Sequence, residues 1–198
     1  MEWVPYLRQS GGERTIILCY KSSMRIIGLA GWSGSGKTTL VARVLPVLTG
    51  RGLRVSTVKH AHHGFDVDIP GKDSHTHRTA GATEVFVSSA RRWAHIHELR
   101  GEEEPDLAAI LARLTPVDLV IVEGYKRHAH PKLEIYRANV GKPLLHPDDD
   151  WIVAIASDGP VPDARVPVLD LNDAEKIADV LLIESIPAER AVAASERV

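Results

Sequence analysis

The sequence is poor in three things: cysteine, net charge and long apolar runs. Its 198 residues include one cysteine, Cys19, so no disulfide can form within the chain, and we expect a reducing, cytoplasmic environment. The formal net charge of −2 argues against a general nucleic-acid binder with a basic face. No apolar run approaches the roughly 20 residues of a bilayer-spanning helix, so we expect no membrane partner. Glu2 and Pro5 near the start argue against a signal peptide.

What is present is a glycine-rich motif at residues 31–38, which reads Gly-Trp-Ser-Gly-Ser-Gly-Lys-Thr and fits the phosphate-loop pattern G-x-x-x-x-G-K-[ST]. The apolar stretch 25–30 precedes it and predicts a buried strand. Residues 39–48 follow it, with apolar side chains at helical spacing. Strand, loop and helix in this order are the context that the motif requires. We therefore expect a nucleoside triphosphate bound together with Mg²⁺.

Each residue type in this motif has a physical reason to bind phosphate. Gly31, Gly34 and Gly36 let the backbone approach phosphate without a Cβ in the way. Successive N–H groups then form an anion-binding nest, and the N-terminus of the following helix adds its own N–H groups. Lys37 supplies a mobile charge for the β- and γ-phosphates, and the Thr38 hydroxyl can ligate Mg²⁺. By position, the predicted nucleotide-binding residues in this motif are Gly31, Trp32, Ser33, Gly34, Ser35, Gly36, Lys37, Thr38 and Thr39.

Strand and helix patterns alternate along the rest of the chain. Strands are predicted at 54–59, 84–88, 93–97, 118–123, 133–137, 151–156 and 166–169. Helices are predicted from 73 to about 80, over 105–114 with Pro105 in the first turn, and over 173–185. This order predicts an α/β fold of the P-loop NTPase class, three-layered, with a mostly parallel sheet and a few antiparallel strands. The predicted nucleotide-binding domain is 24–186, followed by a loose tail at 187–198.

Two further segments have open interpretations. Residues 1–23 are either an N-terminal extension, including an upstream start that native translation does not use, or they contain a short strand at the β-prone stretch 15–20. The strands near 84–97 and 132–137 are additional to a minimal nucleotide fold. If the chain dimerises, these strands are candidates to pair across a two-fold axis.

Glu123 ends the apolar strand 118–123 and is followed by Gly124. In phosphate-loop proteins an acid at the end of such a strand anchors Mg²⁺ directly or through water, because Mg²⁺ takes one or two carboxylates beside phosphates and waters. The usual acid is Asp, whereas here it is Glu. The alternative is an ordinary strand-end acid in solvent. We assign Glu123 to the metal and, together with Lys37, to any catalysis.

Residues 59–78 hold five of the ten histidines and follow the carboxyl end of a predicted strand, where open α/β sheets bind ligands. One interpretation is a transition-metal site, although no cysteine contributes and the spacing matches no closed zinc signature. A second is a loop that senses substrate or nucleotide through cations and one carboxylate, and a third is a solvated polar loop. We favour the second. Its candidate residues are Lys59, His60, His62, His63 and Lys72.

The order of six motifs resembles that of one family. The motifs are Gly-Trp-Ser-Gly-Ser-Gly-Lys-Thr-Thr (31–39), Lys-His-Ala-His-His (59–63), Asp-Val-Asp-Ile-Pro-Gly-Lys-Asp-Ser (66–74), Arg-Trp-Ala (92–94), Val-Glu-Gly-Tyr-Lys (122–126) and Ile-Ala-Ser-Asp (155–158). They look like those of the MobB family, adaptor proteins of molybdopterin-guanine dinucleotide biosynthesis, over about residues 24–185. The resemblance implies a GTP-binding, usually homodimeric protein with weak Mg²⁺-dependent GTPase activity. It also implies the MobA guanylyltransferase as partner, with molybdopterin or molybdoenzyme chaperones as further partners.

The fold also resembles dethiobiotin synthetase. That family holds Mg²⁺ with the phosphate-loop Thr, an Asp that opens the second helix, and the glutamate of a Val-Glu-Gly motif. Carried over by position, the resemblance implies Thr38, Asp73 and Glu123 as metal ligands. Asp66 and Asp68 are rivals for Asp73.

Asp158 follows the predicted strand 151–156 at a position where GTPases read the base. A carboxylate there can accept from both N1–H and the N2 amine of guanine, whereas adenine has an acceptor at N1 and no N2 amine. The usual Asn-Lys-x-Asp motif is missing, so guanine preference rests mainly on the resemblance. The alternative is a loop Asp that starts the Gly159-Pro160 turn.

The leading hypothesis is therefore a GTP-binding adaptor in molybdenum cofactor maturation. A P-loop small-molecule kinase or a dethiobiotin-synthetase-like ligase is the alternative, and Lys126 and Arg127 are its candidates to clamp a phosphoryl group. A histidine-rich metallochaperone GTPase is a third hypothesis.

Overall fold

A computed structural model describes residues 3–10, 13–20, 24–61, 64–125 and 128–195. The chain divides into two compact units. The first unit comprises residues 1–60 and 110–198, and the second comprises residues 61–109. Residues 61–109 thus form a unit of their own within the predicted domain 24–186.

The first unit is built on a mostly parallel sheet. Six of its strands lie in the order β10-β9-β8-β3-β7-β4, and all neighbours in this path run parallel. Their bounds are β3 (Arg25–Ala30), β4 (Val55–Lys59), β7 (Leu119–Glu123), β8 (Lys132–Tyr136), β9 (Ile152–Ser157) and β10 (Val168–Asp170). The short β11 (Ile186–Pro187) pairs antiparallel with the start of β3. This sheet and its helices confirm the predicted α/β class.

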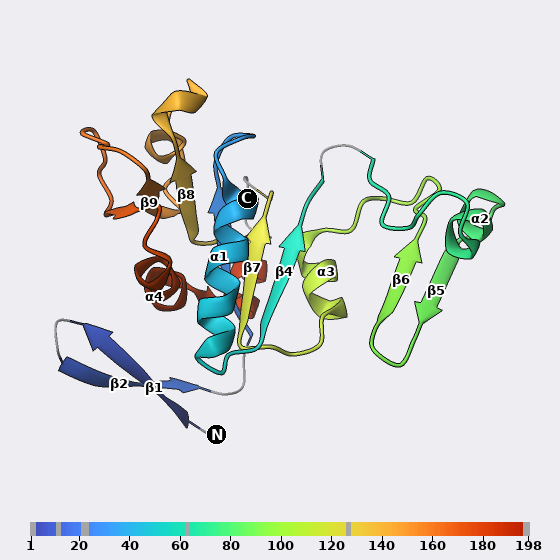
Figure 1. Cartoon of the computed structure of the whole chain (residues 1–198), viewed down its shortest axis with the longest axis horizontal. Coiled ribbons are helices and arrows are strands. Elements are labelled where there is room, and N and C mark those ends of the chain that lie inside the picture. The colour runs from blue at the N-terminus through green and yellow to red at the C-terminus, as the bar shows by residue number, and fades with distance from the viewer. Residues whose placement is uncertain (1–2, 11–12, 21–23, 62–63, 126–127, 196–198) are drawn as a thin grey trace. The chain divides into compact units, whose positions relative to one another are not determined.

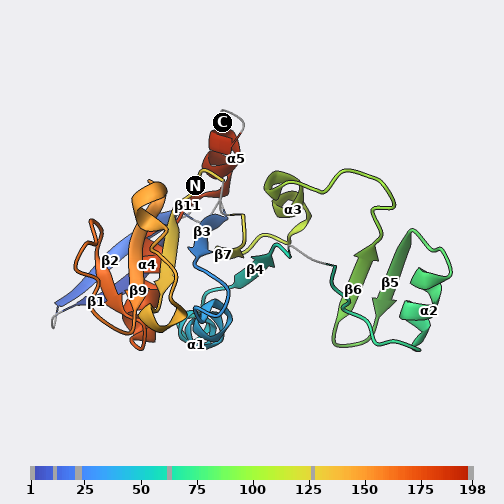
Figure 2. The same cartoon turned by 90° about the horizontal axis from the view of Figure 1, so that it is seen from above.

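Both faces of the sheet are covered, as a parallel sheet requires. Helices α1 (Lys37–Gly50) and α4 (Ala174–Glu184) bury their apolar stripes against one face. The side chains in this core include Ile27, Leu29, Leu40, Val44, Leu48, Ile121, Leu133, Ile135, Ile177 and Leu181. Figure 1 shows α1 lying along the sheet, and Figure 2 shows α5 (Ala188–Ser195) on the other side of β3 from α1. On that second face Ala30, Ile152 and Ile155 pack against apolar side chains that flank β9, namely Leu144, Leu145, Val161, Ala164 and Val166.

Helix starts follow from side-chain caps. Asp173 Oδ1 accepts the backbone N–H of Lys176 at 3.0 Å and so caps α4. Asp106 Oδ1 accepts the N–H of Ala109 at 2.7 Å, and α3 (Leu107–Arg113) begins directly after it. The prediction that Pro105 lies in the first turn of this helix was therefore wrong, because Asp106 takes the cap position and leaves the proline outside.

The C-terminal segment also differs from its prediction. In place of a loose tail over 187–198, residues 188–195 form α5. Ala188 and Ala191 are buried, 5% and 1% exposed, which anchors this short helix. Residues 196–198 lie outside the described residues. The small apolar side chains at helical spacing in residues 188–195 are the sequence feature that predicts this helix.

Two antiparallel hairpins complete the fold. The N-terminal β1 (Trp3–Ser10) pairs with β2 (Glu13–Tyr20), which confirms the β-prone interpretation of residues 15–20. In the second unit β5 (Glu84–Ser88) pairs with β6 (Trp93–His97). The same unit contains the helix α2 (Asp73–Thr79), which precedes β5 in the sequence. β8 lies inside the main sheet between β3 and β9, so the suggestion that residues 132–137 pair across a two-fold axis was wrong.

Two 3₁₀ helices, Ala138–Val140 and His146–Asp148, follow β8. No helix in the described ranges is long and apolar enough to cross a membrane.

Candidate nucleotide site

Five parallel strands of the first unit end at one edge of the sheet. Ligands of open α/β sheets bind at this edge, outside the carboxyl ends of the strands. The residues at or directly after these ends are the phosphate loop 31–38 after β3, Lys59 on β4, Glu123 on β7, Arg137 after β8 and Asp158 after β9.

The phosphate loop adopts backbone angles that require glycine. Gly31, Gly34 and Gly36 have φ of 141°, 82° and 96°. At Gly31 a Cβ would lie 2.6 Å from the Ile135 carbonyl oxygen and 2.8 Å from Ser35 Oγ, so a larger residue would distort the loop. Gly31 and Ser35 are buried, whereas Ser33, Gly34, Thr38 and Thr39 are exposed. The buried residues fix the shape of the loop, and the exposed ones can meet a ligand.

The polar groups of the loop suit an anion. Lys37 Nζ donates to the carbonyl oxygens of Gly31 at 2.8 Å and of Trp32 at 2.9 Å, so its ammonium lies against the loop. Helix α1 has no acidic residue in its first turn, which leaves its positive dipole end uncompensated from within that turn. The Ser35 hydroxyl is buried and has no hydrogen-bond partner among the described residues. A buried orphan hydroxyl, an ammonium and free helix N–H groups together fit the phosphates of a nucleotide.

Neighbouring segments hold the loop from outside. Trp32 Nε1 donates to the Pro143 carbonyl oxygen at 2.8 Å, and Lys142 Nζ lies 5.8 Å from the centre of the Trp32 ring. The segment that carries these residues is itself fixed by the buried Glu134. Its carboxylate accepts the N–H groups of Leu145 and His146 at 2.7 and 2.8 Å.

The carboxyl ends of β4 and β7 bring Lys59 and Glu123 together. The two residues are paired in register, and Lys59 Nζ lies 3.8 Å from Glu123 Oε1. On its other side Glu123 is in register with Leu29, two residues before the phosphate loop. Its side chain is 18% exposed, against 62% for Lys59. The Glu123 carboxylate is thus held at the level of the loop and within reach of solvent.

His60 packs closely on the turn after β7. Gly124 has φ of 111°, and a Cβ there would lie 2.5 Å from His60 Cβ. The N–H of His60 donates to the Glu123 carbonyl oxygen at 2.8 Å. The ring of Tyr125 lies 5.0 Å from the ring of His60 and also 5.0 Å from that of His128. The first histidine of the predicted loop is therefore part of an aromatic group beside Glu123.

The second unit holds the other predicted acids. Asp73 is the first residue of α2 and is exposed. Asp66 and Asp68 instead pair with Arg78: Nη2 lies 2.6 Å from Asp66 Oδ1 and 2.8 Å from Asp68 Oδ1. Arg78 Nη1 also donates to Glu98 at 3.0 Å. The hydrogen bonds between Asp68 and Arg78 lower the pKa of the Asp68 carboxyl and raise the pKa of the Arg78 guanidinium.

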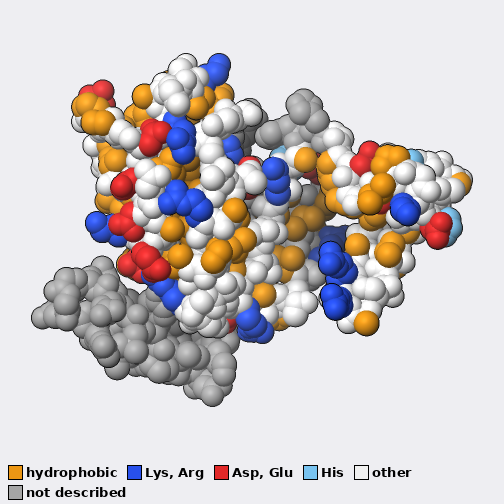
Figure 3. Space-filling model, viewed as in Figure 1, with side chains coloured by type: hydrophobic (Ala, Val, Ile, Leu, Met, Phe, Trp, Pro, Cys, Tyr) orange, Lys and Arg blue, Asp and Glu red, His pale blue; other side chains and the backbone are white. Residues whose placement is uncertain are grey.

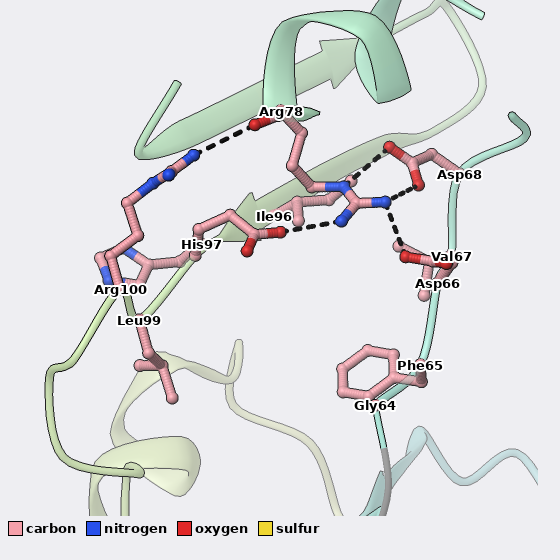
Figure 4. A pocket seen from close by; sticks show the side chains of 11 residues that line it. Gly64, Phe65, Asp66, Val67, Asp68, Arg78, Ile96, His97, Leu99 and Arg100 are labelled. Atoms are coloured by element: carbon pink, nitrogen blue, oxygen red, sulfur yellow. Dashed lines mark hydrogen bonds and ion pairs between the residues drawn. The ribbon is translucent and has the colours of Figure 1, made fainter. Parts of the chain in front are cut away.

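Figure 4 shows the Arg78 guanidinium between β6 and the loop segment that carries Asp66 and Asp68. These residues line a pocket of about 360 Å³. Because Arg78 engages oxygens of both carboxylates, they are weaker candidates for Mg²⁺ than the exposed Asp73.

The predicted residues therefore fall into three groups. Thr38, Glu123, Lys59 and His60 belong to the first unit, at or next to one sheet edge. Asp66, Asp68, Lys72 and Asp73 belong to the second unit. His62, His63, Lys126 and Arg127 lie outside the described residues. Within the described ranges, no group of three or more His, Cys, Asp or Glu side chains is arranged to hold a metal ion.

Sequence reasoning missed Arg137, which contacts both the phosphate loop and Asp158. Arg137 Nε donates to the Ser35 carbonyl oxygen at 3.1 Å, and Nη1 donates to Asp158 Oδ2 at 2.8 Å. Its position at the end of the predicted strand 133–137 was the available signal. The adjacency of β8 to β3 and β9 could not be read from the chain.

Comparisons with known proteins agree with this architecture. The family model described as "Molybdopterin guanine dinucleotide synthesis protein B" (MobB) matches residues 26–158. The chain is 41% identical over 165 residues to the molybdopterin-guanine dinucleotide biosynthesis adapter protein of Escherichia coli (strain K12), which covers 82% of this chain and 94% of that protein. The protein of the same name from Haemophilus influenzae is 37% identical over 166 residues, 83% of this chain and 92% of that protein.

A solved structure has the same fold. The crystal structure of molybdopterin-guanine biosynthesis protein B superposes with a TM-score of 0.63 at 30% identity, over 80% of this chain and 98% of that one. The family match covers more than half of the chain, and two relatives exceed 30% identity over most of their length. The chain belongs to the MobB family.

Proposed function

We propose that this protein is a GTP-binding adaptor in molybdopterin-guanine dinucleotide biosynthesis that assists the MobA guanylyltransferase. The observation that carries the proposal is the phosphate loop with Lys37, Thr38, Glu123 and Asp158 at a single sheet edge. The relatives named as adapter proteins of this biosynthesis support the same role. Cytoplasmic localisation follows as part of the proposal.

The residues of the edge have distinct roles in this proposal. The loop N–H groups and the Lys37 ammonium bind the phosphates of GTP, and the Thr38 hydroxyl with the Glu123 carboxylate holds Mg²⁺. Asp73, which the resemblance to dethiobiotin synthetase implies as a further ligand, belongs to the second unit. Mg²⁺ supplies charge neutralisation on the β- and γ-phosphates. Asp158 accepts from the guanine edge and discriminates against adenine.

Nucleotide-dependent partnering fits the division into two units. Lys59 ends β4, His60 follows it, and the next residue begins the second unit. A change at Glu123 upon metal binding acts directly on its ion partner Lys59 and its backbone partner His60. We propose that GTP and Mg²⁺ order the histidine-rich loop through these contacts, as phosphate contacts order switch segments. Hydrolysis by such a site is slow and Mg²⁺-dependent.

The second unit supplies a surface for partners. Hydrophobic side chains reach its surface (Figure 3), among them Phe65 at 73%, Phe86 at 63% and Trp93 at 65% exposure. The rings of Phe86 and Trp93 stack with centres 5.2 Å apart on the β5–β6 hairpin. A two-stranded hairpin is marginal without further packing. We propose that this surface serves homodimer formation and binding of the guanylyltransferase.

One observation favours a second candidate, a P-loop small-molecule kinase or ligase. Lys59 beside Glu123 at the loop edge is a cation that such an enzyme can use on a transferring phosphoryl group. Rapid turnover of GTP or ATP with a metabolite would support this candidate. Turnover that stays slow with every metabolite tried supports the adaptor.

Calorimetric titration with GTP and ATP in the presence of Mg²⁺ tests the proposal. We expect GTP to bind more tightly than ATP, and Lys37→Ala to abolish binding of both. Arg51→Lys is a matched control, because Arg51 pairs with Glu175 and Asp179 at the other end of α1. Unchanged GTP affinity in Lys37→Ala would remove the loop from the proposal, and equal GTP and ATP affinities would remove Asp158 from base recognition.

A further inference from the structure

Arg137 links the phosphate loop to the end of β9 through a single guanidinium group. Its Nε donates to the Ser35 carbonyl oxygen at 3.1 Å and its Nη1 to Asp158 Oδ2 at 2.8 Å. The two partners lie 102 and 21 residues away in the sequence. The side chain is half-buried, so it is ordered by both contacts rather than free in solvent.

We propose that Arg137 is a positioning residue that couples phosphate binding to base selection. This inference rests on the proposed GTP-binding function and adds a residue that sets its affinity and its specificity. Two separate geometric consequences carry it, one on the loop and one on Asp158.

The first consequence concerns the peptide between Ser35 and Gly36. In a planar trans peptide the C=O and the following N–H point in opposite directions. Because Arg137 holds the Ser35 carbonyl oxygen, the Gly36 N–H is turned away from Arg137. That N–H is one of the donors of an anion-binding nest. The contact therefore sets a phosphate donor in place before a ligand arrives.

Gly36 itself is fitted to this contact. It has φ of 96°, and a Cβ there would lie 3.4 Å from Arg137 Nε and 3.6 Å from Nη2. A side chain at Gly36 would thus press on the guanidinium as well as strain the backbone. The close approach of loop and guanidinium depends on glycine at this position.

The second consequence concerns Asp158. The hydrogen bond to Nη1 fixes the Oδ2 oxygen and with it the plane of the carboxylate. Among the described residues, Oδ1 has no partner and Oδ2 has this one donor, so the carboxylate keeps lone pairs on both oxygens for a ligand. A guanine edge presents two neighbouring donors, so it needs a carboxylate in a defined orientation. Arg137 supplies that orientation from the same group that holds the loop.

Arginine suits this bridge better than lysine. The guanidinium is a planar group whose Nε and Nη1 donors point in fixed, different directions. A lysine ammonium keeps the charge but is a compact point on a flexible stem. Arg137→Lys therefore preserves electrostatic attraction to phosphate and removes the fixed two-way contact.

The test compares inorganic triphosphate, GTP and ATP as probes, each titrated with Mg²⁺ by calorimetry. We expect Arg137→Lys to weaken inorganic triphosphate binding about tenfold, the loss of one charge-assisted hydrogen bond, and to lower the ratio of GTP to ATP affinity. Asp158→Asn should lower that ratio while leaving triphosphate affinity near the wild-type value. Because the two residues are in contact, the double variant should lose less GTP affinity than the sum of the single variants.

Thermal unfolding and Arg51→Lys serve as controls. Arg51 is another bridging arginine of the first unit, and its conservative substitution should leave all three affinities unchanged. A lower melting temperature in Arg137→Lys with unaltered affinities and ratio would overturn the inference, because the contact would then be structural only. If the wild-type protein bound none of the probes, the proposed function would fall and this inference with it. If the wild-type protein bound GTP and Arg137→Lys left the three affinities unchanged, this inference would be overturned while the proposed function would stand.

Discussion

Lys59 and Glu123 form an ion pair across β4 and β7, with 3.8 Å between Nζ and Oε1. The pair joins the strand that leads to the second unit with the acid assigned to Mg²⁺. A metal at Glu123 would compete with the Lys59 ammonium for the same carboxylate. The pair is therefore the contact through which metal binding would reach the following histidine-rich segment.

Glu123→Gln should selectively remove the effect of Mg²⁺ on GTP binding. The amide keeps the shape of the side chain but loses the charge that a hard cation prefers. We expect Mg²⁺ to tighten GTP binding in the wild-type protein and to do so about tenfold less in the variant. Calorimetry with Mg²⁺ and with a chelator measures both. Glu175→Gln, at an exposed ion pair with Arg51, is the control. An undiminished Mg²⁺ effect in Glu123→Gln would contradict the metal assignment.

Gly124→Ala should be clearly more destabilising than Gly141→Ala. Both glycines have positive φ, 111° and 66°, but only the Cβ of residue 124 would meet a neighbour, His60 Cβ at 2.5 Å. Around Gly141 nothing lies within 4 Å, so its cost is the backbone strain of about 1 kcal/mol alone. For Gly124 we expect about 3 kcal/mol, since steric displacement of His60 is added.

Urea unfolding of the two variants measures this difference. Equal losses of unfolding free energy would mean that His60 can move away at little cost. That result would contradict the tight packing of His60 on the turn after β7.

The buried pair of Lys132 and Asp149 predicts unequal costs for its two partners. Lys132 Nζ lies 3.0 Å from Asp149 Oδ2, and the side chains are 3% and 22% exposed. Burial lowers the pKa of Lys132, and Asp149 opposes that shift. Asp149→Ala would leave the ammonium buried without a partner and should cost about 3–5 kcal/mol of unfolding free energy.

Lys132→Met should cost less, because methionine is apolar and of similar length, and Asp149 is exposed enough to be hydrated. Chemical denaturation of both variants decides the order. A larger loss for Lys132→Met than for Asp149→Ala would contradict the assignment of Lys132 as the more deeply buried partner.

The β5–β6 hairpin should depend on pH through Glu84 and His97, which are paired in register. His97 Nδ1 lies 2.8 Å from Glu84 Oε1 and its Nε2 lies 3.1 Å from Glu102 Oε2. These hydrogen bonds raise the pKa of His97 above 6.5 and lower that of Glu84 below 4.5. His95, 3.4 Å from the same carboxylate, adds to the lowering.

The sign follows from the two shifts. The His97 contribution is fully present below pH 6.5 and is lost as the pH rises through the raised pKa. The Glu84 contribution is present above pH 4.5 and is lost as the pH falls through the lowered pKa. NMR titration should give a His97 midpoint above 6.5 that moves down in Glu84→Gln. A wild-type midpoint at or below 6.5 would contradict the ion pair.

Most elements of the fold follow from local sequence pattern. The strands at 84–88 and 93–97 have the predicted bounds, and the phosphate-loop strand agrees as well. The predictions fail where an element also depends on a contact with another residue, which the local sequence pattern does not show. The helix at Pro105 starts later because Asp106 caps it, and the tail is helical because Ala188 and Ala191 find a surface to pack on.

The candidate site was predictable only as separate motifs. The phosphate loop, Glu123 and Asp158 each carry a chemical signature in a short stretch. Arg137 carries none, because its role depends on β8 lying between β3 and β9. The pairing of Asp66 and Asp68 with Arg78 was hidden for the same reason, since their contacts form only when the loop folds back on α2.

Retention of this protein on immobilised MobA guanylyltransferase, with and without GTP and Mg²⁺, measures whether it is a nucleotide-dependent adaptor. We expect stronger retention with GTP and Mg²⁺ together than with either alone. We also expect Lys37→Ala to lose this gain while keeping its fold by circular dichroism. Absence of retention under every condition, or retention equal with and without nucleotide, would contradict a nucleotide-dependent adaptor.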